Sequence, residues 1–370
     1  MARSSLRILA LVTDAFGGHG GIAQYNCDFL SALAACEEVR EIIVLPRTTE
    51  QSPSTLPAGV RQLNPVQNRA GYSLAALWTA TAHRPIDVVF CGHPYMAPLS
   101  AGIAKVLRAP LWVQVHGVDA WAELSAVYRR SLETAALITA VSRFTRQRLL
   151  SWVGIDPVRV KILSNTVNPK FRPGPKPSYL MERYGVEGKK VITTVSRLAS
   201  VEQYKGHDRV IRALPRVLLE HPGTIYLIVG DGDDRPRLEA LAAECGLAEK
   251  VCFTGRVASE ELPDHFRLAD VLVMPSTGEG FGIVFLEAMA TGIHVIGGNQ
   301  DGSLDPLADG VLGRAVDPDS TEELASAICA SLLSPPANPD LAGRFDILEF
   351  KKHLREIVRI LPEMKRSGRV

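Results

Sequence analysis

Short runs of β-branched and aliphatic residues alternate with stretches of helical hydrophobic spacing along most of the chain. Before residue 170 these runs are LRILALVT, EIIVLP, IDVVFCG, APLWVQVHG, ALITAVS and VKILSN. After it they are VITTVSR, TIYLIVGDG, VCFTGRV, DVLVMPS and HVIGG. A strand–helix–strand repeat of this kind is typical of parallel sheets covered by helices on both faces. The pattern therefore predicts an α/β protein with two doubly wound, Rossmann-like sheets in tandem.

The segment NPKFRPGPKPS, residues 168–178, separates the two sets of predicted strands and contains four prolines in eleven residues. Because proline and glycine at this density interrupt regular structure, we expect a linker over 169–178 between an N-terminal domain, 1–168, and a C-terminal domain, 179–351. A chain of 370 residues is long enough for two such domains. A last helical pattern over 345–361 either stays with the second domain or returns to the first, to which residues from about 352 to 370 would then belong.

Composition excludes several classes of protein. No apolar run reaches the roughly 18 residues that a membrane span needs. The apolar run near the N-terminus leads through Asp14 into glycines, so we interpret it as a first strand and not as a signal peptide. The six cysteines form no CxxC pair, which suits a reducing cytoplasmic compartment, and we interpret all six as small hydrophobic residues.

The net charge of +1 hides an asymmetry, because residues 1–170 hold 17 Lys+Arg against 11 Asp+Glu while the remainder holds 24 against 29. The positive excess is densest in 128–154, where three arginines alternate with apolar residues at near-helical spacing: Arg143, Arg146, Arg148, Phe144, Leu149, Leu150 and Trp152. Two interpretations stay open for the basic helix expected at 143–153. It either contacts an anionic membrane surface or presents a solvated face over a core stripe.

Candidate chemistry follows the predicted strands, at the carboxyl ends where ligands of doubly wound sheets bind. With two such domains, the expected site is the cleft between them. The segment GGHGGIAQYN, 17–26, follows the first strand and opens a helix, so the backbone amides at Gly20 and Gly21 are candidates to cradle a phosphate. A nicotinamide dinucleotide site and a purely structural turn are the alternatives for these glycines.

Three segments of the second half fit a ligand that carries a diphosphate. Arg197 and Lys205 in SRLASVEQYKGHD are two cations able to meet it without a metal ion. Asp231 lies in VGDGDD, which fits either a metal-binding DxD or the turn chemistry of glycine and aspartate. In GEGFGIVFLEAMATG, 278–292, we expect a helix to begin near Gly282.

That helix would direct the amides of Phe281, Gly282 and Ile283 outward from its positive end. Glu287 on its second turn can accept hydrogen bonds from both hydroxyls of a ribose, and Glu279 in the preceding loop can accept from the hydroxyls of a sugar. These residues together predict a site for a nucleoside diphosphate sugar, held at both ends.

At this point the sequence resembles a known family. SRL…YKG, GDG, FTGRV…EEL and EGFGIVFLE, together with GGHGGI and VHGVD, are similar to motifs of the retaining glycosyltransferases of family four, nearest the mannosyltransferase-like members. The resemblance spans nearly the whole chain in consistent order. It implies the GT-B fold, in which two Rossmann-like domains face each other across a cleft.

The resemblance also implies a role for each matching residue. Arg197 and Lys205 would bind the diphosphate and stabilise the leaving nucleotide, Glu287 would hold the ribose, and Glu279 with the helix amides would hold the sugar. Gly20 and Gly21 would line the phosphate side. The remaining donor residues would be Asp231 and, at the nucleobase, Arg256. His116 in QVHGVD would reach the sugar or the incipient bond, and Asp119 would orient it.

The implied reaction moves a hexose with retention of anomeric configuration, by front-face substitution in which the departing phosphate helps to deprotonate the acceptor. No cofactor and no metal ion are expected. The resemblance favours GDP-mannose, otherwise a UDP-sugar, as donor and implies a saccharide or lipid-linked saccharide as acceptor, in polysaccharide or glycolipid synthesis. We expect a cytoplasmic protein, peripheral on the inner face of the cytoplasmic membrane where the acceptor is lipid-linked, with no nucleic-acid partner.

Other functions stay open at this stage. A phosphorylase or nucleotide-sugar epimerase of the same fold, or a non-catalytic nucleotide-sugar binder, would share these donor motifs. Two positions depart from the family pattern: His294 stands where proline is common, and Asn168 where aspartate is usual. Neither belongs to the donor motifs.

Overall fold

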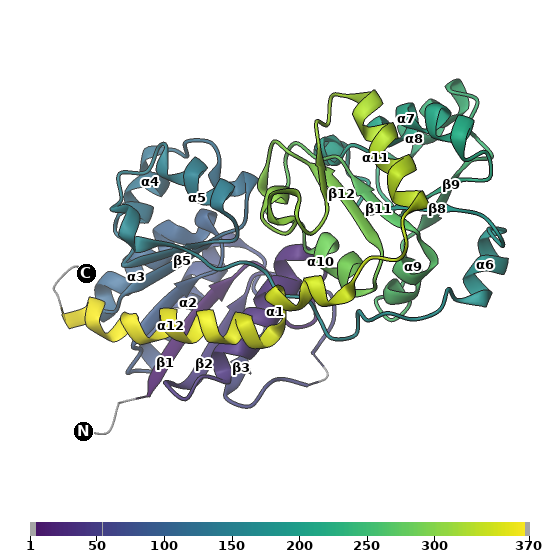
Figure 1. The fold of residues 1–370 in the computed structure, drawn as a ribbon. Helices are drawn as coiled ribbons and strands as arrows, with labels where there is room; N and C mark the ends of the chain where they lie inside the picture. The colour runs from purple at the N-terminus through teal and green to yellow at the C-terminus, as the bar shows by residue number, and fades with distance from the viewer. Residues whose placement is uncertain (1–4, 54, 367–370) are drawn as a thin grey trace. The chain divides into compact units, whose positions relative to one another are not determined.

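The computed structural model describes residues 5–53 and 55–366. They form two compact units, the first running to Thr166 and resuming at Ile347, the second spanning Val167–Asp346 (Figure 1). The predicted linker, 169–178, thus lies inside the second unit. The final helix, α12 (Ile347–Arg366), belongs to the first unit, which thus resumes at Ile347 and not near residue 352.

The first unit contains a seven-stranded sheet in the order β3-β2-β1-β4-β5-β6-β7, in which every neighbouring pair is parallel. Its central strands are buried along almost their whole length, which explains their continuous apolar runs. The strands are β1 (Leu6–Val12), β2 (Val39–Pro46), β3 (Val60–Gln62), β4 (Val88–Cys91), β5 (Leu111–Val115), β6 (Leu137–Ala140) and β7 (Val160–Ile162).

Helices connect these strands: α1 (Gly21–Ala34), α2 (Arg69–Ala82), α3 (Ala97–Leu107), α4 (Ala126–Glu133) and α5 (Arg143–Leu150). Helix α12 packs against α1. Tyr25 and Phe350 meet edge to face with ring centroids 6.5 Å apart, and Arg359 pairs with Glu38 at 2.9 Å. The chain's last helix therefore completes the first unit.

The second unit contains a six-stranded parallel sheet in the order β10-β9-β8-β11-β12-β13. Its strands are β8 (Val191–Val195), β9 (Ile225–Val229), β10 (Val251–Gly255), β11 (Val271–Met274), β12 (His294–Gly298) and β13 (Arg314–Val316). Its helices are α6 (Ser178–Tyr184), α7 (His207–Glu220), α8 (Arg235–Glu244), α9 (Leu262–Leu268), α10 (Ile283–Ala290) and α11 (Thr321–Leu333). Two doubly wound parallel sheets confirm the predicted fold class.

Each sheet reverses its strand order at one place. In the first unit this place lies between β1 and β4, and in the second between β8 and β11. Loops that leave the carboxyl ends of two such strands diverge to opposite faces, which opens a crevice where ligands bind. Gly20 and Gly21 follow β1, Lys205 follows β8 and Glu279 follows β11.

The basic stretch around α5 has its apolar side covered within the first unit. Phe144 packs edge to face on Trp121 with centroids 4.9 Å apart, and the Trp152 indole donates to the carbonyl of Ala120 at 2.9 Å. Arg146 donates to the carbonyl of Val160 at 2.9 Å. These contacts fit a solvated face over a core stripe.

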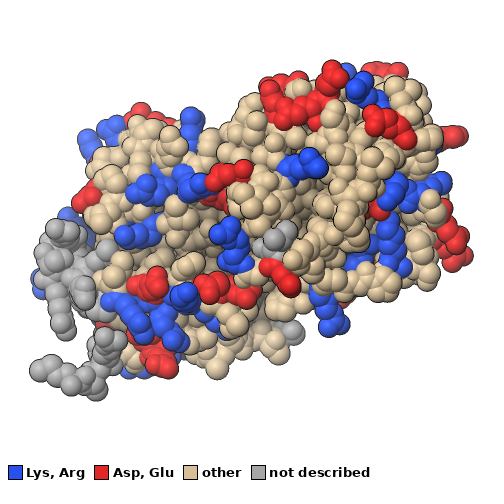
Figure 2. All heavy atoms as spheres, in the orientation of Figure 1, with Lys and Arg blue, Asp and Glu red and all other residues tan. Residues whose placement is uncertain are grey.

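Lysine and arginine residues are intermixed with aspartate and glutamate on the face of the molecule seen in Figure 2. Among the described residues, no helix has the length and apolarity needed to cross a bilayer.

Candidate active site

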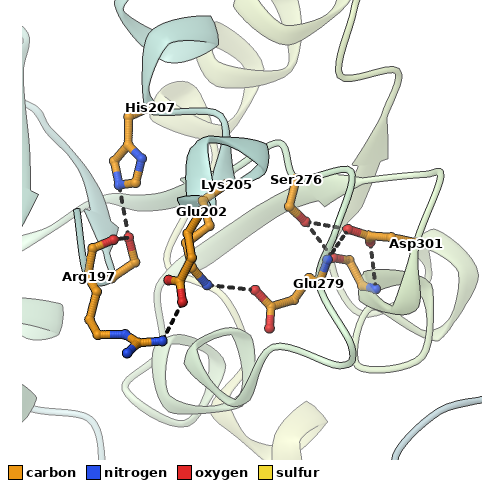
Figure 3. Close-up of polar contacts among 9 residues, drawn as sticks. Arg197, Glu202, Lys205, His207, Ser276, Glu279 and Asp301 are labelled. Carbon is orange, nitrogen blue, oxygen red and sulfur yellow. Dashed lines mark hydrogen bonds and ion pairs between the residues drawn. The ribbon is translucent and has the colours of Figure 1, made fainter. Parts of the chain in front are cut away.

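An ion pair lies at the carboxyl ends of the two central strands of the second sheet. Lys205 ends a short 3-10 turn, Ser200–Lys205, in the loop after β8, and Glu279 lies in the loop after β11. The Lys205 Nζ donates to Glu279 Oε2 at 3.0 Å (Figure 3). The side chains are 14% and 19% exposed. The two residues thus share one partly enclosed position at the strand-order reversal.

The ammonium of Lys205 is favoured by its surroundings. Burial works against the ammonium of Lys205, but the Glu279 carboxylate beside it outweighs burial and raises the pKa of Lys205 above its ordinary value. A partly desolvated cation next to a carboxylate is suited to a ligand that combines phosphate with hydroxyl groups. The cation binds the phosphate, and the carboxylate accepts hydrogen bonds from the hydroxyl groups.

The second predicted cation, Arg197, pairs with Glu202 in the same loop. Its side chain is 75% exposed, so the guanidinium is open to a ligand. Behind it, the hydroxyl of Ser196 forms a hydrogen bond of 2.9 Å with His207 Nε2. Burial lowers the pKa of His207 to about 4, and the nearby Lys205 charge adds to this. His207 is therefore neutral at physiological pH and braces the start of α7.

The GDG turn after β9 is built by local hydrogen bonds. Asp231 accepts from the amide of Gly232 at 3.0 Å, and Asp233 accepts from both the amide and the hydroxyl of Ser200 at 2.8 and 2.6 Å. Arg235 lies 3.8 Å from Asp231. The aspartates thus serve the turn and its neighbours, as glycine–aspartate turn chemistry predicts.

A buried aspartate in the loop after β12 fixes the Glu279 loop. Asp301 has 0% exposure, and its Oδ2 accepts from the Ser276 hydroxyl and from the amide of Glu279, both at 2.7 Å. The amide of Gly302 in turn donates to the carbonyl of Glu279 at 2.9 Å. Because both backbone polar groups of Glu279 are held, its side chain starts from a fixed position.

Helix α10 begins at Ile283, as expected. Its N-cap, Gly282, has φ +87°, and a Cβ there would lie 2.5 Å from the ring of Phe285, so only glycine fits. Phe281 is buried against Phe345 with ring centroids 5.8 Å apart, which anchors the helix start. Glu287 is half-buried on the second turn of α10. Arg256, the residue predicted to lie at the nucleobase, is exposed in the loop after β10.

In the first unit, His116 follows β5. Its Nε2 lies 3.0 Å from the carbonyl oxygen of Gly92, so this nitrogen carries the proton and donates, while Nδ1 of the neutral ring is an acceptor. Burial lowers the pKa of His116, which favours that neutral ring. Asp119 accepts from the backbone amide of His116 at 3.1 and 3.2 Å. The carboxylate therefore fixes the backbone of His116, and the ring is set by Gly92 and by the edge of Tyr25, 5.0 Å away.

His93 also belongs to this group. It follows β4 and places Nε2 3.9 Å from Asp119, and its ring centroid lies 6.4 Å from that of His116. Sequence reasoning missed it. The available signal was its place in CGHPY, directly after a predicted strand at the strand-order reversal.

The glycines after β1 leave the start of α1 open. Gly20 caps the helix with φ +92°, and a Cβ at Gly20 or Gly21 would meet no atom within 4 Å. A helix N-terminus with room beside its first residues can accept an anion. No side chain of these two residues stands in its way.

Comparison with known proteins decides the family. A model of the group 1 glycosyl transferases matches residues 181–343, and a model of glycosyltransferase family 4 matches residues 19–171. The GDP-mannose-dependent alpha-(1-6)-phosphatidylinositol monomannoside mannosyltransferase of Mycolicibacterium smegmatis is 36% identical over 266 residues, covering 67% of each protein. The chain belongs to glycosyltransferase family 4.

Other similarities of this glycosyltransferase extend over more of its length. A Corynebacterium glutamicum enzyme named GDP-mannose-dependent monoacylated alpha-(1-6)-phosphatidylinositol monomannoside mannosyltransferase is 29% identical over 347 residues, 87% of this chain and 88% of that one. The crystal structure of HepE from Anabaena in complex with UDP-glucose superposes with a TM-score of 0.78 at 22% identity, covering 96% of this chain and 100% of HepE. This likeness confirms the GT-B fold.

For this family 4 glycosyltransferase, the structure brings some predicted residues together and adds others. Lys205 and Glu279 are in contact, and His116 and Asp119 are in contact through the backbone. The supporting residues that the predicted site lacks are Glu202, His207, Ser276 and His93, while Asp301 gains a defined role.

Proposed function

We propose that this glycosyltransferase moves a mannosyl group from GDP-mannose to a saccharide or lipid-linked saccharide acceptor, with retention of anomeric configuration. The observation that carries the proposal is the Lys205–Glu279 ion pair at the strand-order reversal of the second sheet. A nucleotide sugar joins a diphosphate directly to a polyhydroxylated ring, so a cation and a carboxylate in contact match the two halves of that junction.

Each donor group then has a partner of matching chemistry. Lys205 and the exposed Arg197 bind the diphosphate, and Glu279 with the amides at the start of α10 binds the sugar hydroxyls. Glu287 accepts from the ribose hydroxyls. In the flanking loops after β9 and β10, Asp231 and Arg256 meet the rest of the nucleotide.

GDP-mannose is favoured as donor by the relatives, whose names specify GDP-mannose-dependent mannosyl transfer to a phosphatidylinositol mannoside. HepE, at lower identity, was crystallised with UDP-glucose, so UDP-sugars are the competing donors. The names of the mannosyltransferases also favour a lipid-linked acceptor, for which we assign residues of the first unit, with His116 and Asp119 near the acceptor and Gly20 and Gly21 on the phosphate side.

In the proposed reaction the bond between the anomeric carbon and the phosphate oxygen breaks as the acceptor oxygen bonds to the same face of that carbon. The departing phosphate takes the proton of the acceptor hydroxyl. Lys205 and Arg197 stabilise the negative charge that develops on the leaving diphosphate, so no metal ion is needed for transfer. Because attack and departure use the same face, the product keeps the configuration of the donor.

We also propose that the protein is peripheral on the inner face of the cytoplasmic membrane, through α2. Leu74, Leu77 and Trp78 are exposed and lie on one side of this helix. Exposed leucine and tryptophan on one side of a helix are residues that insert into the boundary of a bilayer. Sedimentation with anionic vesicles tests this: binding should fall in L74S/W78S but not in L348S, an equally exposed leucine on α12. Equal binding of both variants would count against α2.

The proposed function is tested with the purified protein, a panel of GDP- and UDP-sugars, and mannosylated phosphatidylinositol as acceptor. We expect acceptor-dependent release of GDP from GDP-mannose alone, and an α-linked product by NMR. The matched control for K205A is K190A, since Lys190 pairs with Asp270 at 3.5 Å but precedes β8, at the opposite end of the strand. Equal rates in K205A and K190A would overturn the role of Lys205. Release of UDP alone would overturn GDP-mannose as the donor.

A further inference from the structure

A cysteine, a histidine and a glutamate meet where the end of α7 packs on α11. Glu220 is the last residue of α7, His221 follows it, and Cys329 lies in α11. Each of the three residues offers one metal-ligating atom, and these atoms all lie within 4.8 Å of one another. Sequence analysis assigned Cys329 a purely hydrophobic role, because the partners are more than a hundred residues away along the chain.

Cys329 and the Nε2 atom of His221 have little access to water. Cys329 is 5% exposed. The His221 Nε2 atom is buried and has no hydrogen-bond partner within the described residues, and the same is true of Thr224 Oγ1 one turn further on. A buried polar atom without a partner is rare in proteins, because it loses its water and gains nothing in return. A bound cation would supply the missing interaction of the imidazole.

The ligand types indicate which cation. Thiolate sulfur, imidazole nitrogen and carboxylate oxygen are the ligands that Zn²⁺ takes in proteins. With bonds of about 2.0–2.3 Å, the ligand atoms of a tetrahedral zinc site lie roughly 3.5 Å apart. The exposed Glu220 closes the remaining distance by rotation of its side chain.

We propose that Glu220, His221 and Cys329 form a zinc site with water as fourth ligand. Zinc displaces the thiol proton of Cys329 to solvent and binds the thiolate. The thiolate and carboxylate give the ligand set a charge of −2. Arg216, which pairs with Glu322 at 3.3 Å, is a cation close enough to interact electrostatically with Cys329.

This zinc ion would link two helices of the second unit, away from the donor site. Helix α7 begins beside the donor site at His207 and runs for 14 residues to Glu220, a length of about 21 Å. The ion therefore lies a full helix length from Lys205 and ties α7 to α11 without touching the donor. The inference is independent of the proposed function.

The test uses the full chain, stripped of metal and titrated with Zn²⁺ in competition with a chromophoric chelator. We expect one Zn²⁺ per chain, binding that is lost in C329S and H221Q, and weaker binding in E220Q. The control is C245S, in a cysteine of the same unit outside the cluster. With Co²⁺, the wild type and C245S should show a thiolate-to-cobalt absorption band that C329S lacks.

Far-ultraviolet circular dichroism establishes that each variant is folded. Zn²⁺ at about 100 times its dissociation constant should raise the melting temperature of the wild type and of C245S by a few degrees, and leave C329S unchanged. Zinc binding of equal strength in wild type and C329S, a cobalt complex without the thiolate band, or no stoichiometric binding by the wild type would each overturn the proposal.

Discussion

Lys205 and Glu279 are 74 residues apart in the chain, yet their charged atoms are 3.0 Å apart at the carboxyl ends of adjacent parallel strands. The sheet topology produces this contact, because β8 and β11 are neighbours at the place where the strand order reverses. A diphosphate on Lys205 therefore has its attached sugar beside Glu279. This proximity leads to the first prediction.

Replacing either residue of the pair should nearly abolish transfer. In K205A the charge developing on the leaving diphosphate loses its cation, and loss of one such preorganised donor lowers kcat by about 100- to 1000-fold. E279Q keeps the shape of the side chain but removes the charge, so we expect a comparable loss with an intact fold. Initial rates of GDP release measure both. A variant that retains at least half the wild-type kcat would contradict the proposed site.

Asp301 should act through the position of Glu279. In D301N one carboxylate oxygen becomes an amide that faces an N–H donor, since the two oxygens of Asp301 accept from Glu279 and Ser303. We expect kcat to fall on the order of 100-fold while KM for the donor changes little, because the phosphate cations are untouched. D319N, at an exposed aspartate paired with Arg209, is the control. A change confined to KM would argue against a positioning role.

Gly282 should tolerate no side chain. In G282A the new Cβ would have to adopt φ +87° and would lie 2.5 Å from Phe285, and we expect roughly 2–4 kcal/mol of destabilisation from strain and crowding. Gly246 provides the comparison in the same unit, since its φ is +70° but nothing lies within 4 Å. Urea unfolding of G246A should show about 1 kcal/mol. Equal losses in the two variants would mean that crowding at α10 is unimportant.

The sequence predicts the main features of the fold because its strands are buried on both faces and read as continuous apolar runs. The sequence pattern does not predict two strands, β3 and β13. Both are three-residue strands at the sheet edges. Short edge strands need no apolar run, so their pairing is decided by the neighbouring strand. The apolar runs therefore predict the long central strands, whereas the pairing of β3 and β13 does not follow from them.

The candidate site likewise contains residues that the sequence predicts and residues that it does not. Lys205 and Glu279 belong to motifs with fixed local spacing, YKG and EGFGIVFLE, whereas the supporting Asp301 and His207 belong to neither motif. Their roles depend on burial and on contacts made only after the strands are assembled, as in the bond from the Glu279 amide to Asp301. Likewise Asp119 has the predicted partner, His116, but binds its amide and not its ring. Sequence spacing identifies the residues and not the atoms that meet.

His207 should make stability depend on pH. Its pKa is lowered to about 4 in the folded chain, against about 6.5 when unfolded, so the unfolded state binds the proton first as pH falls. Stability should therefore drop below about pH 6.5, by about 2 kcal/mol between pH 7 and pH 5 from this residue. Urea unfolding at the two pH values measures it, and H207Q should remove this part of the drop. An identical pH dependence in wild type and H207Q would contradict the assignment.

Removal of divalent metal should separate the two proposed sites. Transfer by the wild type should be unchanged within twofold in excess EDTA, because Arg197 and Lys205 take the place of a metal ion at the diphosphate. The melting temperature of the wild type should nevertheless fall, because zinc leaves the cluster of Glu220, His221 and Cys329. In C329S, EDTA should change neither the rate of transfer nor the melting temperature. Rates and melting curves of both proteins, with and without EDTA, provide the comparison. Loss of transfer in EDTA that Mg²⁺ or Mn²⁺ restores in both proteins would instead place a metal ion at the diphosphate and assign Asp231 as its ligand.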